Sequence, residues 1–317
     1  MGSGDQDKNP GAEFSYQLGK IYDDFFTINQ NLEKKEKEAE PESPESTPKL
    51  ISLEEALARL NSLIGLTTVK KQIGSLTNVL KIEKLRREQG LPVPEKSLHM
   101  VFSGNPGTGK TSVARVLAEI FRSLGVLQKG HLVEVDRAGL VAGFVGQTAG
   151  KTLEVCKKAL DGILFIDEAY SLGGGENDFG KEAIQTLLKF MEDNRNRILV
   201  IAAGYTQNMQ DFLATNPGLE SRFNTFIEFP DYSPSELMLI FEKIAGDSNI
   251  VLHPDAKSKA LTLVESKYNS RNETFGNARY IRNLFEKAYV QQADRLSKEP
   301  EVQKDSLCIL LAEDIPD

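Results

Sequence analysis

Apolar runs alternate with amphipathic segments along the middle of the chain, and this alternation predicts strands separated by helices. The runs at 100–103, 162–166 and 197–203 are almost unbroken in apolar residues, which is typical of parallel strands buried on both faces. Shorter strand patterns lie at 131–135 and 226–229. Between the strands, apolar residues recur at helical spacing. We therefore predict an α/β fold with a parallel sheet flanked by helices.

The segments on either side of this region carry helical patterns. Ser52, with Glu55 three residues later, forms a capping box, so we expect a helix to begin there and a second helix to cover 67–88. Further helices are expected at 235–245, 254–268 and 277–297, and 306–312 suits either a short strand or a short helix. The expected domains are an α/β domain over 49–229 and a small all-helical domain over 230–317.

Residues 1–48 differ in composition from the rest of the chain. They contain five basic and eleven acidic residues and so carry −6 of the total formal charge of −8. A heptad pattern of apolar residues predicts an amphipathic helix; these residues are Phe14, Leu18, Ile21, Phe25, Ile28 and Leu32. The helix could dock on its own domain or bind a partner or another copy. The Pro-, Glu- and Ser-rich stretch at 41–48 is expected to be an extended linker.

Composition narrows the class of protein. A chain of 317 residues with 40% hydrophobic content can bury a sizeable core, and its net charge of −8 argues against general binding to nucleic acid or to anionic membranes. The two cysteines form no C-x-x-C pair, which suits a reducing cytoplasm, and the three histidines show no metal-ligand spacing. The longest apolar runs are too short to span a bilayer, so no membrane association is expected.

A phosphate-binding loop lies between the first long strand and the helix after it. Gly104, Gly109, Lys110 and Thr111 fit the pattern G-x-x-x-x-G-K-[ST]. Glycines let backbone N–H groups wrap a phosphate, the lysine reaches the β- and γ-phosphates, and the hydroxyl can bind Mg²⁺. ATP contacts are expected from the loop and the start of the helix; the residues are Pro106, Gly107, Thr108, Gly109, Lys110, Thr111 and Ser112.

Two acids close the next buried strand. Asp167 at the strand end is expected to hold Mg²⁺ together with Thr111, and Glu168 is expected to polarise the attacking water. An acidic pair at a strand end can also be merely solvated. Its combination with the phosphate loop favours ATP hydrolysis.

The chain resembles the AAA+ ATPases, and within them the branch of stage V sporulation protein K and the red-type Rubisco activase CbbX. The resemblance covers roughly 63–296 and excludes the first 48 residues. It rests on ten short motifs, at 97–100, 104–111, 129–132, 145–149, 164–171, 203–205, 216–219, 221–223, 229–233 and 275–279.

This resemblance implies a ring, usually hexameric, with ATP between neighbouring subunits. Arg222 matches the arginine finger that reaches a neighbour's γ-phosphate, although a surface ion pair would also explain an arginine there. Arg279 matches the lid arginine that contacts nucleotide within the same subunit, with Arg282 as the fallback. Ile64 and Gly65 match the segment that lines the adenine pocket.

The resemblance also implies a pore loop. Phe144 and Gly146 match an aromatic–aliphatic–glycine tripeptide that grips a threaded polypeptide. The alternative interpretation is that Phe144 is an ordinary residue of the hydrophobic core. In such proteins a polar residue often follows the strand that corresponds to 197–203. Here Tyr205 or Thr206 could take that place and position the attacking water.

The expected function is ATP-driven remodelling of a protein client pulled through a central pore. The alternative is an ATP-gated scaffold or switch that binds a partner through its N-terminal helix without threading.

Overall fold

The computed structural model describes residues 51–94, 96–144, 146–173 and 179–317. The chain divides at residue 50, and residues 51–317 form one compact unit. The predicted N-terminal amphipathic helix and its linker therefore lie outside the described residues, as do residues 174–178. Within the described residues, no helix is long and apolar enough to cross a membrane.

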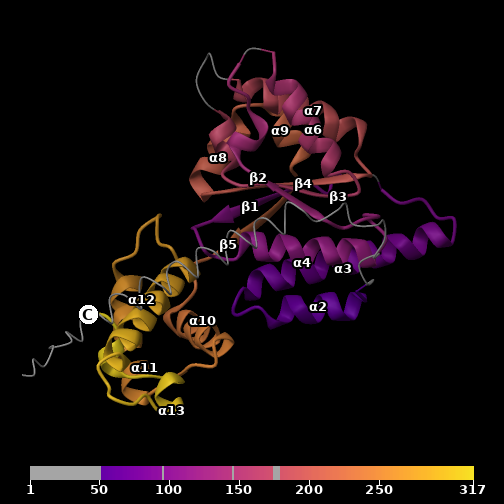
Figure 1. The fold of residues 1–317 in the computed structure, drawn as a ribbon. Coiled ribbons are helices and arrows are strands. Elements are labelled where there is room, and N and C mark those ends of the chain that lie inside the picture. The colour runs from indigo at the N-terminus through magenta and orange to yellow at the C-terminus, as the bar shows by residue number, and fades with distance from the viewer. Residues whose placement is uncertain (1–50, 95, 145, 174–178) are drawn as a thin grey trace, which may run out of the picture. The chain divides into compact units, whose positions relative to one another are not determined.

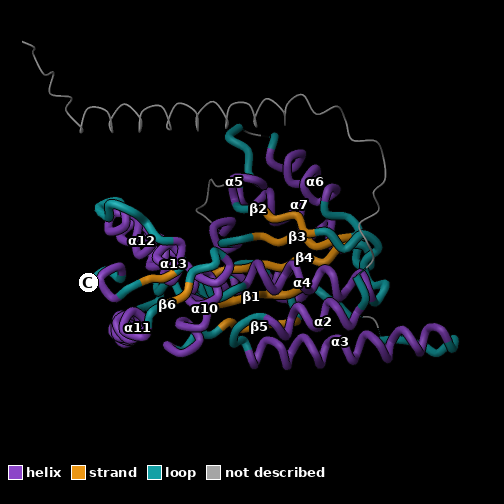
Figure 2. Tube along the Cα trace, turned by 60° about the horizontal axis from the view of Figure 1, so that its bottom comes forward, coloured by secondary structure: helices purple, strands orange, loops and turns teal. Residues whose placement is uncertain are grey.

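A parallel sheet forms the centre of the α/β part, as predicted (Figure 1). Its strand order is β2-β3-β4-β1-β5, and Figure 2 shows the strands side by side in this order. All registers are parallel. The strands are β1 (Met100–Gly104), β2 (Leu132–Val135), β3 (Gly162–Ile166), β4 (Ile198–Gly204) and β5 (Thr225–Phe229). Every residue of β3 and β4 is buried, which explains their unbroken apolar sequences.

Helices cover both faces of the sheet (Figure 1). On one face lie α2 (Leu53–Ser62), α3 (Thr67–Glu88) and α4 (Lys110–Ser123), and on the other lie α6 (Thr148–Lys158), α7 (Gly180–Asp193), α8 (Thr206–Ala214) and α9 (Pro217–Arg222). The short helix α5 (Arg137–Leu140) packs against α6 and α7. A one-turn 3₁₀ helix, η1 (Ala169–Gly173), follows β3. The predicted capping box of α2 is present, with the Ser52 side chain and Glu55 satisfying each other's backbone N–H groups.

The C-terminal part is a helical lid. It contains α10 (Pro234–Asp247), α11 (Pro254–Asn269), α12 (Ala278–Leu296), α13 (Lys304–Leu307) and the short 3₁₀ helix η2 (Ala312–Asp314). Two strands of two residues each, β6 (Val251–Leu252) and β7 (Ile309–Leu310), pair in a small parallel sheet. Strand β7 lies within 306–312, where either a short strand or a short helix was expected, whereas β6 was not predicted. One hydrophobic cluster runs from the sheet through Tyr232 into the lid at Phe241 and Phe285.

The structure differs from the predicted elements in the segments that lack strong periodicity. A short helix that the pattern did not predict, α5, follows β2, and the Asp136 carboxylate caps it by accepting the Gly139 N–H at 2.9 Å. Two helices that the pattern did not predict, α8 and α9, follow β4. Asn216 caps α9 by accepting the Gly218 N–H, and Pro217 occupies its first position.

Candidate functional site

A cavity of about 580 Å³ opens where β1, β3 and β4 end and the lid begins. In parallel sheets, ligands bind outside the carboxyl ends of the strands, at the point where the strand order reverses. In this sheet β2, β3 and β4 lie on one side of β1 and β5 lies on the other, so the strand order reverses at β1. The cavity lies at the carboxyl end of β1 and therefore at this point. The volume lies within the range of small-molecule sites.

The phosphate loop after β1 forms one wall of the cavity. Gly107 and Gly109 have φ values of +70° and +94°, a conformation that favours glycine. Helix α4 then starts at Lys110 without a side-chain cap, so its first N–H groups are left to an incoming group. Such a helix start, with its positive dipole end, is suited to binding a phosphate.

Lys110 is held inside the loop by backbone carbonyls. Its ammonium donates to the carbonyl oxygens of Gly104 at 2.8 Å and Asn105 at 2.9 Å. Burial lowers the pKa of Lys110 to about 8; Arg279 also lowers it, whereas Asp167 and Glu168 raise it. A bound phosphate would place negative charge beside this desolvated ammonium and so stabilise its charged form.

Asp167 and Glu168 line the same cavity from the end of β3. The Asp167 carboxylate accepts the Glu168 N–H at 3.1 Å, and Glu168 has a φ of +47°. The hydroxyl of Thr111 and the Asp167 carboxylate are hard oxygen donors, which suit Mg²⁺. Among the described residues no cluster of three or more His, Cys, Asp or Glu side chains could hold a metal by itself. These residues therefore fit an ion that nucleotide phosphates help to hold.

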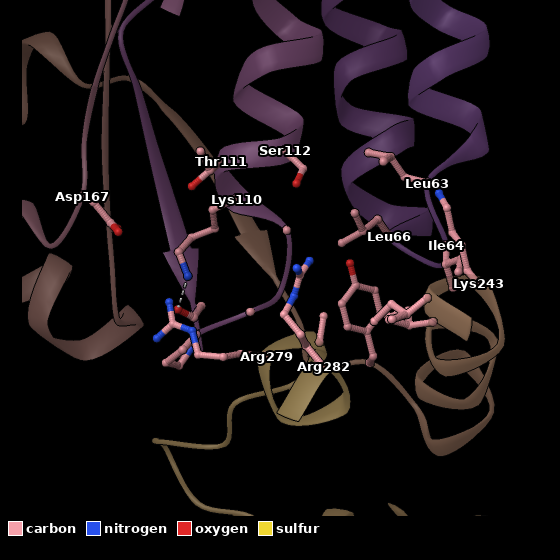
Figure 3. Close-up of a pocket in the computed structure, with 18 of the residues that line it drawn as sticks. Leu63, Ile64, Leu66, Lys110, Thr111, Ser112, Asp167, Lys243, Arg279 and Arg282 are labelled. Carbon is pink, nitrogen blue, oxygen red and sulfur yellow. Dashed lines mark hydrogen bonds between the residues drawn. The ribbon is translucent and has the colours of Figure 1, made fainter. Parts of the chain in front are cut away.

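The other end of the cavity is mostly apolar, although Lys243 and Asp247 of α10 also line the cavity. Leu63, Ile64 and Leu66 come from the turn between α2 and α3, and Ile240 and Ile244 face them from α10. Figure 3 shows Asp167 and Lys110 at one side and the Leu63–Leu66 turn at the other. A site with a charged end and an apolar end is suited to a nucleotide, whose phosphates and base have the matching properties.

The structure brings most of the predicted nucleotide residues together. Those that line the cavity are Ile64, Pro106, Gly107, Gly109, Lys110, Thr111, Ser112, Asp167, Glu168 and Arg279. Arg282, the fallback to Arg279, lines it as well. Two predicted residues do not. The buried Thr108 hydroxyl donates to the Asn105 carbonyl at 2.8 Å, and Gly65 packs against the Glu236 side chain, which leaves no room for a Cβ.

Arg222 lies at the end of α9 and does not line this cavity. Its guanidinium donates to the Glu192 carboxylate at 3.1 Å and to the Gly218 carbonyl at 3.2 Å. The Nε atom is buried and has no hydrogen-bond partner among the described residues. The surface ion pair that sequence reasoning held open thus exists, and it leaves one donor unsatisfied.

Phe144 is 73% exposed, so it is not a core residue. The neighbouring glycines, Gly143 and Gly146, have open space where a Cβ would stand. Val145 lies outside the described residues. The structure therefore places this aromatic side chain on the surface, in the connection between α5 and α6.

Several cavity residues were not predicted. Tyr232, Ile240, Lys243, Ile244 and Asp247 come from the domain junction and from α10. Tyr232 lies in the motif at 229–233, but that motif alone assigns it no place in the site. Only tertiary folding brings α10 to the phosphate loop, so no local sequence signal marks the residues of α10. Of the two residues considered after β4, Tyr205 lines the cavity, whereas Thr206 is not among the lining residues.

A phosphate loop on a parallel sheet, an acidic strand end beside it and a helical lid together define a P-loop ATPase. Residues 100–231 match the family described as "ATPase family associated with various cellular activities (AAA)", and residues 233–317 match the AAA lid domain.

Individual relatives narrow this assignment. Stage V sporulation protein K of Bacillus subtilis (strain 168) is 44% identical over 83% of this chain and 82% of its own length. The chloroplastic ribulose bisphosphate carboxylase/oxygenase activase of Cyanidioschyzon merolae is 41% identical over 84% and 92%. Protein CbbX of Cereibacter sphaeroides is 45% identical over 74% and 76%. The chain therefore belongs to the AAA ATPase family of stage V sporulation protein K, CbbX and this activase, and it is an ATPase.

Solved structures support the fold. The AAA domain of FIGL-1 in complex with ADP superposes with a TM-score of 0.57 at 16% identity, covering 84% of this chain and 90% of that one. A Thermotoga maritima RuvB mutant gives 0.51 at 20% identity, covering 82% and 71%.

Proposed function

We propose that this ATPase works as a hexameric ring. The ring binds ATP with Mg²⁺ and uses the hydrolysis of ATP to pull on a protein client. In this proposal, residues 49–229 form the nucleotide-binding domain, residues 230–317 form the lid, and the protein acts in the cytoplasm. The observation that carries client pulling is the 73% exposure of Phe144, because a large exposed aromatic side chain is suited to gripping a polypeptide.

The charged cavity residues and the apolar turn have separate roles in the proposed hydrolysis. Lys110 and the N–H groups of the phosphate loop hold the β- and γ-phosphates, and Thr111 and Asp167 would hold the magnesium ion, which would neutralise charge on the phosphates. Glu168 accepts a proton from the attacking water. Arg279 contacts the phosphates from the lid, and the Leu63–Leu66 turn holds the base.

Arg222 acts on a neighbouring subunit's nucleotide in this proposal. It is absent from the cavity of its own chain, and its buried Nε lacks a hydrogen-bond partner among the described residues. A guanidinium supplied from outside the cavity can stabilise negative charge that develops on the transferred phosphoryl group.

The grip is tested by photocrosslinking. A photoreactive phenylalanine analogue replaces Phe144 in the Glu168→Gln variant, which should bind ATP and retain its client. The matched control carries the analogue at Phe226, a second exposed phenylalanine, which is 54% exposed on β5. We expect ATP-dependent crosslinks to a non-self polypeptide from position 144 and not from position 226.

Equal crosslinking from the two positions would contradict the grip. It would favour the alternative, an ATP-gated switch that binds a partner through residues 1–48 without threading. Deletion of these residues would then abolish partner binding, whereas Phe144→Ala would not affect it.

A further inference from the structure

Asn277 is fully buried at the junction between the phosphate loop and the lid. It precedes α12 at the cap position, where asparagine normally accepts a hydrogen bond from the start of the helix. Its side chain makes no such bond here. The side chain of Asn277 therefore does not cap α12, and its hydrogen bonds go to other parts of the chain.

The Asn277 amide joins the lid to the α/β part. Its oxygen accepts the Tyr232 N–H at 3.0 Å, and its nitrogen donates to the Asp231 carboxylate at 2.7 Å. The carbonyl oxygens of Phe275 and Pro106 lie at 3.1 Å and 3.3 Å from the same nitrogen. An amide nitrogen has two hydrogens, so these three acceptors share them. One of the acceptors belongs to the phosphate loop itself.

Asp231 extends the connection to a second point of the loop. The same carboxylate oxygen that accepts from Asn277 also accepts from the Asn105 amide at 2.9 Å. Its other oxygen lies 3.3 Å from the Arg271 guanidinium. The carboxylate therefore stands between an amide of the phosphate loop and an amide of the lid.

The backbones of the two parts also touch. The Ala278 N–H, the first of α12, donates to the Gly107 carbonyl at 3.2 Å. A Cβ at Gly107 would lie 2.2 Å from the Gly276 carbonyl oxygen and 2.8 Å from the Arg279 nitrogen. The first turn of the lid helix is thus seated on the loop that receives the phosphates, and Arg279 belongs to that turn.

We propose that Asn277 is a positioning residue that fixes Arg279 against the phosphate loop. The hydrogen bonds of its amide hold the start of α12 at a fixed position on the phosphate loop. The lid arginine, Arg279, is thereby held at a fixed position relative to the phosphates. This inference rests on the proposed role of Arg279 in binding nucleotide. It adds a residue that touches no nucleotide itself but sets where the lid arginine stands.

The backbone of Asn277 provides a sharp variant. Its φ of +45° with ψ of −122° lies in a region that favours glycine, so glycine removes the side-chain bonds without adding backbone strain. Asn249 is the matched control, because it is also a lid asparagine with a positive φ, +56°, but is exposed. Asn249→Gly should bind ATP like the parent.

The experiment measures the dissociation constant of a fluorescent ATP analogue for the full-length Asn277→Gly and Arg279→Ala variants and for the double variant. Each single change should weaken binding by about tenfold. Arg279→Ala removes a charge-assisted contact to phosphate, and Asn277→Gly removes the alignment of that contact. The double variant should bind like Arg279→Ala alone, since Asn277 acts through Arg279. Asp231→Ala, which removes the acceptor of the 2.7 Å bond, is combined with Arg279→Ala in parallel.

Two outcomes would overturn the inference while leaving the proposed function intact. One is parental binding by Asn277→Gly with weakened binding by Arg279→Ala. The other is a double variant whose defect is the full product of the two single defects. Parental binding by both Arg279→Ala and Lys110→Ala would instead contradict the proposed nucleotide site, so the two failures are distinguishable.

Discussion

At the scale of single residues, the phosphate loop and the acidic strand end were predictable because their chemistry fixes their spacing. Glycines, a lysine and a hydroxyl must follow one another to wrap a phosphate, and so the pattern is visible without a structure. Thr108 and Gly65 show the limit of this reasoning. Each lies inside a predicted motif, yet the Thr108 hydroxyl donates to the Asn105 carbonyl and Gly65 packs against the Glu236 side chain, so neither is left to line the cavity.

Glu168→Gln should separate binding from turnover. The amide has nearly the same shape but cannot accept a proton, so kcat should fall by roughly 10²- to 10³-fold while the affinity for ATP stays within about twofold. Steady-state hydrolysis and nucleotide titration on the same preparation measure both quantities. Hydrolysis at the parental rate would assign the proton acceptor to another residue.

His99 should make the fold sensitive to acid. Its Nδ1 accepts the Val200 N–H at 3.1 Å, and burial, reinforced by Arg222, lowers its pKa to about 4. Because this pKa is below the ordinary 6.5, the folded state disfavours the proton. The stabilisation is complete above pH 6.5 and is lost as the pH falls towards 4, by up to about 3 kcal/mol.

The matched variant is His99→Asn, whose amide oxygen can accept the same N–H but does not titrate in this range. Chemical denaturation between pH 7.5 and 4.5 compares the free energies of unfolding of the two proteins. The parent should lose more stability than the variant, since the carboxylates common to both cancel in the comparison. Identical pH profiles would show that His99 is not the group responsible.

At the scale of elements, prediction succeeded where periodicity or burial was strong. Strands β3 and β4 were evident from unbroken apolar sequence, and α3 covers Thr67–Glu88, the predicted range. Helix α9 was missed although Asn216 and Pro217 form a readable start, because six residues are too few for periodicity to show. The two-residue strands β6 and β7 pair across the lid, a contact that no local pattern reports.

The last element of the lid should depend on one ion pair. Arg295 of α12 donates to both oxygens of Asp314 at 2.8 Å, and the Asp314 side chain is only 1% exposed. Asp314→Ala should lower the free energy of unfolding by about 3 kcal/mol, because the mostly buried guanidinium loses its main partner. Thermal and chemical denaturation measure this loss.

Glu299 offers a control on the same guanidinium. It lies 3.5 Å from Arg295 but is more exposed, so Glu299→Ala should cost less than about 0.5 kcal/mol. Equal losses from the two substitutions would show that burial of the Asp314 pair does not decide its contribution.

At the scale of the whole molecule, the α/β fold and the lid were predictable, but their joint was not. The cavity needs α10, the turn at Leu63–Leu66 and the phosphate loop to meet, and these segments are far apart in sequence. The Asn105–Asp231–Asn277 connection likewise joins residues up to 172 positions apart. Its members lie in the motifs at 104–111, 229–233 and 275–279, but nothing in the sequence shows that these three motifs meet.

Mixing two inactive variants tests whether the site is shared between subunits. Arg222→Ala lacks the finger but keeps its phosphate loop, and Lys110→Ala lacks the loop's cation but keeps the finger. In a ring with head-to-tail contacts, an equal random mixture makes about a quarter of the interfaces competent, because a loop from the first variant meets a finger from the second. Hydrolysis should therefore return to about a quarter of the parental rate, whereas each variant alone stays inactive. Copurification through a tag on one variant establishes that mixed assemblies form. If they form and no ratio restores hydrolysis, Arg222 acts within its own chain, and its pairing with Glu192 is its structural role.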